Sequence, residues 1–82
     1  MRRTPTWAYV VLLIPAAGAA RRLTETHPDV ETAMNVGEWR AREWYPGQVV
    51  EVVVVNRRTG EAVRDRRTGE AIRRTTGKEV MR

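Results

Sequence analysis

Residues 49–80 read VVEVVVVNRRTGEAVRDRRTGEAIRRTTGKEV, an apolar run followed by three copies of one short polar sequence. The first copy starts at Asn56, the second at Asp65 and the third, which is shorter, at Arg74. An Asn or Asp, two unconstrained residues and then Thr-Gly-Glu are typical of a tight hairpin. The short polar side chain accepts hydrogen bonds from the amides that follow, and glycine adopts a positive φ. The repeated sequence therefore predicts one chain reversal per copy.

The spacing of the copies predicts short strands between the turns. Gly60 and Gly69 are nine residues apart and Gly77 follows eight residues later, which leaves about four residues for each strand. We expect a β-meander over residues 48–81, with strands at 49–56, 61–65, 70–74 and 78–81. A solenoid is the less favoured alternative, because the three copies lack a sustained apolar ladder, and disorder of the last turn is the third.

The N-terminal apolar stretch has two interpretations. Residues 6–14 are rich in β-branched and aromatic side chains and are followed by Pro15, which predicts a strand buried on both faces. The outline of residues 1–20 also fits a signal or membrane anchor, because two arginines precede the apolar stretch and small residues end it. The apolar part is shorter than the ~20 residues that span a bilayer, and Arg21 and Arg22 oppose translocation. The sequence favours the buried strand.

A helix is predicted over residues 28–45. Pro28 suits a first helical turn, Asp29 favours the positive end of the helix, and Pro46-Gly47 stops it. At 100° per residue one stripe about 100° wide faces the core, and it contains Val30, Ala33, Met34, Gly37, Ala41 and Trp44. The glycine within this stripe would allow the helix to approach a sheet closely.

Trp39 lies opposite the apolar stripe, among charged residues that include Arg42. Tryptophan and arginine are typical anchors of protein interfaces, so these two residues are candidates for a protein contact. The alternative is that the C-terminal hairpins cover this face, or that the indole lies flat against neighbouring Arg and Glu side chains.

Length and composition indicate one small α+β domain: an amphipathic helix packed on an antiparallel or mixed sheet, with a C-terminal meander. A chain of 82 residues has a marginal core, and without cysteine it has no disulfide to support it. We therefore expect a homo-oligomer or a protein partner.

The net charge of +5 is confined to the repeated region. Residues 1–55 contain six basic and six acidic side chains, whereas residues 56–82 contain nine basic and four acidic ones. Guanidinium groups pair well with phosphates, so we expect contact with nucleic acid or another polyanion. The candidate residues are Arg57, Arg58, Arg66, Arg67, Arg73, Arg74 and Lys78. The alternative is that these charges only keep turns soluble and protect strand edges.

The composition argues against an enzyme. The chain has neither serine nor cysteine, and its single histidine, His27, is expected to cap the helix or lie in solvent. No catalytic, metal-binding or cofactor motif is present, and no small-molecule substrate is indicated. We expect a non-enzymatic cytoplasmic accessory protein, of the kind that phages and mobile elements encode, that binds a polyanion. The alternatives are a structural or inhibitory protein-interaction module and an exported or membrane-tethered protein.

Overall fold

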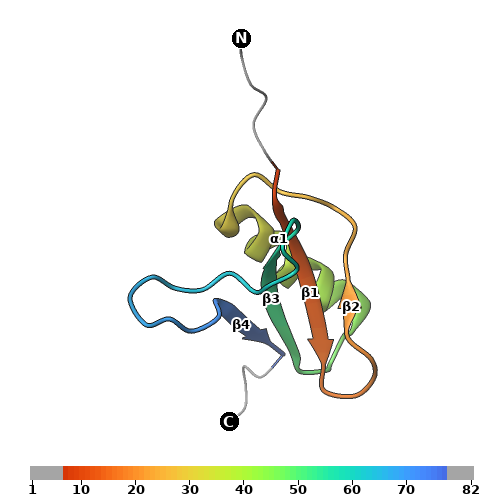
Figure 1. Cartoon of the computed structure of the whole chain (residues 1–82). Coiled ribbons are helices and arrows are strands. Elements are labelled where there is room, and N and C mark those ends of the chain that lie inside the picture. The colour runs from red at the N-terminus through yellow and green to blue at the C-terminus, as the bar shows by residue number, and fades with distance from the viewer. Residues whose placement is uncertain (1–6, 78–82) are drawn as a thin grey trace.

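Two long strands form the centre of the protein, and one helix covers one face of the sheet that they build (Figure 1). The computed structural model describes residues 7–77. The elements in chain order are β1 (Tyr9–Pro15), β2 (Arg21–Arg22), α1 (Val30–Trp44), β3 (Val50–Asn56) and β4 (Arg73–Thr76). The sheet is antiparallel with the order β2-β1-β3-β4, so the predicted α+β class is confirmed.

β1 and β3 pair along their whole length, from Tyr9 opposite Asn56 to Pro15 opposite Val50. Alternate residues point to opposite faces of a strand, so the valine run of β3 is buried on both sides. Val52 and Val54 face the helix, while Val53 belongs to a second apolar cluster on the open face. The predicted N-terminal strand is thus the centre of a sheet, and within residues 7–77 no helix is long and apolar enough to cross a membrane.

Asp29 caps the start of α1. Its carboxylate accepts a hydrogen bond from the backbone N–H of Thr32 at 2.7 Å, and this bond lowers the pKa of Asp29 below its ordinary value. The helix begins two residues later than predicted, because Pro28 precedes the cap instead of occupying the first turn. Its buried face contains Ala33, Met34, Gly37 and Ala41, as the apolar stripe predicts.

Gly37 is a point of close approach between α1 and the sheet. A Cβ atom at this position would lie 2.5 Å from a methyl group of Val52 and 2.8 Å from one of Val11. Both valines are fully buried, and their χ1 angles are restricted by branching, so neither can easily move away. The spacing between helix and sheet therefore requires a residue without a side chain.

The chain that pairs with β3 on the side opposite β1 is interrupted by an inserted hairpin. Ala62 pairs with Val55, and Val63 donates its N–H to the carbonyl of Val54, yet Arg73 lies opposite Val53. An uninterrupted strand would have residue 64 at that place, so residues 64–72 are an insertion of nine residues. This hairpin, called the arm below, projects sideways beyond β4 (Figure 1).

The arm has the length of one sequence repeat. Its two sides meet at an isolated bridge between Arg64 and Ala71. The predicted strand 61–65 is therefore reduced to isolated bridges, whereas the predicted strand 70–74 overlaps β4 at Arg73 and Arg74. β4 occupies residues 73–76 and so extends beyond the predicted strand 70–74 into residues where the third copy predicts a turn. Asn56 and Asp65 lie four positions before the glycines of the first two copies, but the residue four positions before Gly77 is Arg73, so no side-chain acceptor closes a turn there. The predicted strand 78–81 lies outside the described residues.

Gly37→Ala should destabilise the protein, although alanine is the better helix former. Helix propensity alone predicts a gain of about 1 kcal/mol, whereas overpacking a core costs about 1–3 kcal/mol. We expect a net loss in urea unfolding followed by circular dichroism. Asn35→Ala, on the exposed face of the same helix, should stabilise the protein by a few tenths of a kcal/mol. If Gly37→Ala and Asn35→Ala change the free energy of unfolding in the same direction, the close contact at Gly37 is contradicted.

Deletion of residues 64–72 should leave the fold intact. Val63 would then continue directly into β4 with every side chain on its observed face, and half-buried Ile72 would be the largest apolar group lost. We expect the free energy of unfolding to fall by no more than about 2 kcal/mol. Deletion of residues 65–72, one residue shorter, would turn β4 over and expose the buried Thr76. If urea unfolding gives the two deletions equal stability, the inserted-arm description is wrong.

Candidate functional site

The first two sequence repeats form turns with the same hydrogen bonds. Oδ1 of Asn56 accepts from the N–H groups of Arg58 and Thr59, and Oδ1 of Asp65 accepts from those of Arg67 and Thr68. In each turn the glycine N–H also donates to the carbonyl of the Asn or Asp at 2.8 Å, and the glycine φ is close to +78°. These are two of the chain reversals that the sequence predicts. We call them turn 1 (residues 56–61) and turn 2 (residues 65–70, at the tip of the arm).

Both turns expose their arginine pairs. Turn 1 presents Arg57 and Arg58, and turn 2 presents Arg66 and Arg67. None of these four side chains forms a salt bridge with another residue between positions 7 and 77. Their charge is therefore available to an external anion.

The third arginine pair lies in a different environment. Arg73 and Arg74 are consecutive in β4, so their side chains point to opposite faces of the sheet. Arg73 binds Glu51 at 3.0 Å on the open face, and Arg74 binds Glu38 of α1 at 3.3 Å on the helical face. These two predicted binding residues are engaged within the fold, and Lys78 lies outside the described residues.

Arg64 supports the arm from within. Its guanidinium donates to the carbonyl of Gly69 at 2.8 Å, across the hairpin. The backbone of Asp65 also donates to and accepts from the opposite side, through Glu70 and Gly69. The short arm is thus held as a two-stranded ribbon by several hydrogen bonds between its sides.

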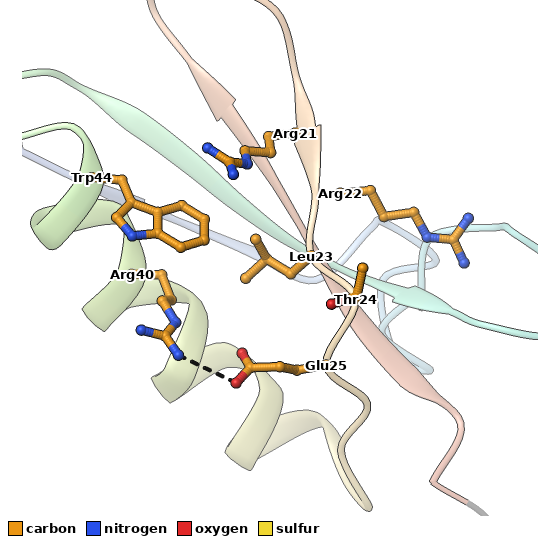
Figure 2. Close-up of a pocket in the computed structure, with 7 residues that line it drawn as sticks. All are labelled: Arg21, Arg22, Leu23, Thr24, Glu25, Arg40 and Trp44. Atoms are coloured by element: carbon orange, nitrogen blue, oxygen red, sulfur yellow. Dashed lines mark hydrogen bonds and ion pairs between the residues drawn. The ribbon is translucent and has the colours of Figure 1, made fainter.

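The extended segment from Arg21 to His27 divides its side chains between the two faces of the sheet. Arg21 and Glu25 point toward α1, whereas Arg22 points away from it (Figure 2). Sequence reasoning missed this segment because β2 has only two residues, too few for a strand signal. The alternation of Arg22, Thr24 and Thr26 along it was the available clue.

Two arginines and two tryptophans form a continuous stack along α1. The guanidinium of Arg21 lies 4.3 Å from the ring centre of Trp44, and that of Arg40 lies 5.6 Å from Trp44 and 4.8 Å from Trp39. Arg40 is held by Glu25 and by Glu43 of the same helix, both at 3.2 Å, and the bond to Glu25 raises the pKa of Arg40 (Figure 2). Arg21, Glu25, Arg40 and Trp44 line a hollow of about 300 Å³ beside β2.

The two predicted interface residues lie on different parts of the helix surface. Trp39 is 57% exposed and belongs to the stack. Arg42 lines another hollow, with Tyr45, Gln48 and Thr76, where the helix meets β4. Trp44, predicted to face the core, is instead 38% exposed, because it packs against Arg21 at the edge of the sheet.

His27 neither caps the helix nor lies in solvent. It is only 7% exposed, and its backbone exchanges hydrogen bonds with Tyr9 at the start of β1. The prediction was wrong because Asp29 supplies the cap and the chain before it extends the sheet edge. Across residues 7–77, no three His, Asp or Glu side chains lie close enough together to hold a metal ion.

Comparison with known protein families, with curated proteins and with solved structures gives no match.

Proposed function

We propose that this protein binds duplex nucleic acid without sequence preference, through the arginines of turns 1 and 2. The observation that carries the proposal is the arm, a hydrogen-bonded ribbon with Arg66 and Arg67 exposed at its tip. The sheet does not need the arm, and the two arginines at its tip form no salt bridge within residues 7–77. Such a segment is suited to contact with a partner.

The two-stranded form of the arm favours B-form DNA. A two-stranded ribbon fits the major groove of B-DNA, which is about 12 Å wide. The major groove of A-form RNA is too deep and narrow for side chains to enter. We therefore expect duplex DNA to bind more tightly than duplex RNA of the same sequence.

The chemistry of the turns favours phosphate contacts over base recognition. No aromatic side chain lies within either turn, so stacking of unpaired bases is not expected there. Arginine binds phosphate oxygens through two parallel hydrogen bonds, and such contacts position a protein without reading sequence.

Arg66→Gln together with Arg67→Gln should weaken DNA binding and its salt dependence. Four phosphate contacts predict a loss of about 10²-fold in affinity between 50 and 200 mM salt. Removing two of them should reduce the slope of log K against log salt by about 2. Fluorescence anisotropy with a labelled 20-base-pair duplex measures both quantities.

Arg42→Gln is a control, because it removes an exposed arginine that lies in neither turn. It should change the slope by much less than one substitution in turn 2. The deletion of residues 64–72 should resemble the double substitution or exceed it. Absence of DNA binding at 50 mM salt, or an equal effect of Arg42→Gln and Arg67→Gln, would refute the proposed function.

A second function, self-association through the helix, is favoured by the tryptophan stack. Trp39 is exposed, and Arg40 beside it is already fixed by two carboxylates, so little side-chain entropy would be lost on binding. In this case the protein would act as a structural module.

Trp39→Ser should then lower the self-association constant measured by sedimentation equilibrium, because a large apolar contact is lost. Trp7→Ser is the matched control, since Trp7 is 50% exposed and lies outside the stack. A wild-type protein that stays monomeric up to about 1 mM would exclude this function.

A further inference from the structure

A second hollow lies on the open face of the sheet, on the side of β2 away from the helix. It measures about 290 Å³ and is lined by Val10, Arg22, Leu23, Thr24, Thr26 and Arg57. It combines two guanidinium groups, two hydroxyl groups and an apolar floor. No carboxylate is among the lining residues that the described part of the chain supplies.

Two separate parts of the fold bring the polar groups of this hollow together. Arg22, Thr24 and Thr26 are alternate residues of one extended segment, so their side chains share a face. Arg57 comes from turn 1, and its backbone N–H donates to the carbonyl of Ala8 at 2.6 Å. That bond fixes the start of turn 1 beside β1, within reach of the β2 edge.

The charge of the hollow is not balanced within residues 7–77. Neither Arg22 nor Arg57 takes part in any of the salt bridges there. The acidic residue nearest in sequence to the hollow's threonines, Glu25, points toward the helix and binds Arg40 (Figure 2). Two like charges at one hollow repel each other, and a bound anion would remove that repulsion.

We propose that this hollow binds a phosphoryl group. Arg22 and Arg57 donate paired hydrogen bonds to its oxygens, and the hydroxyls of Thr24 and Thr26 donate to the remaining ones. The group belongs either to a nucleic-acid backbone or to a free phosphate compound. If the group belongs to a nucleic-acid backbone, the inference rests on the proposed function and extends it, because Arg22 then joins the arginines of turn 1 as a phosphate contact.

The test is a titration of the ¹⁵N-labelled full chain with sodium pyrophosphate at low ionic strength, followed by two-dimensional NMR. We expect saturable shifts in the amides of residues 22–26 and 57 and in the side-chain Nε–H signals of Arg22 and Arg57. Arg22→Gln should abolish these shifts, whereas Arg42→Gln should leave them unchanged. Sodium sulfate at matched ionic strength controls for general anion binding.

A parallel titration with a DNA duplex identifies the source of the phosphoryl group. Shifts at the same residues with both ligands, and a salt slope reduced by about 1 in Arg22→Gln, support a backbone phosphate. Shifts with pyrophosphate alone indicate that the hollow binds a free phosphate compound, and this outcome does not depend on the proposed function. The inference is overturned if neither ligand shifts residues 22–26, even when DNA binds at turn 2. Equal shifts with sulfate also overturn it.

Discussion

The position of β3 between two neighbours is the constraint on which the other features depend. It pairs with β1 along seven residues on one side and with two separate segments, Ala62-Val63 and β4, on the other. Its valines are buried on both faces, which is why the run lacks the polar alternation of a half-exposed strand. The one break in the run, Glu51, lies on the open face and binds Arg73. Turn 1 begins where β3 ends, so the pairing of β3 also fixes Arg57 beside β1.

Because the repeats are similar, two registers of pairing with β3 are possible, and the turns decide between them. Ala62-Val63 and Ala71-Ile72 are nearly identical, and either pair could lie opposite Val55 and Val54. Burial does not decide between them, because valine and isoleucine differ by one methylene group. The alternative would leave residues 56–70 as a single long loop and lose the hydrogen bonds that close turn 1. The observed register keeps the hydrogen bonds that close both turns. The additional repeat therefore projects from the sheet as a separate ribbon, the arm.

The parts of the fold that the sequence predicts are those with a local signal. The apolar runs of β1 and β3, the buried stripe of α1, and the turns that end at Gly60 and Gly69 each depend on residues within a few positions of one another. The arm and the hollows beside β2 depend on which residues lie opposite each other, and a repeat leaves that register ambiguous. The prediction that all three arginine pairs of residues 56–82 bind an anion assumes that all six side chains face solvent. Only the pairing of β4 places Arg73 and Arg74 beside carboxylates.

The same dipeptide, Arg-Arg, thus acquires different electrostatic roles in different backbone contexts. In β4 the two side chains separate to opposite faces, and each face offers a carboxylate from a neighbouring element. In the turns the backbone of the second arginine is bound by the Asn or Asp side chain, and both arginines are exposed and form no salt bridge within residues 7–77. In β2, Arg21 stacks on Trp44 while Arg22 turns to the open face. A polyanion would therefore meet the turn arginines and Arg22, whereas the arginines of β4 are paired with Glu51 of the sheet and Glu38 of the helix.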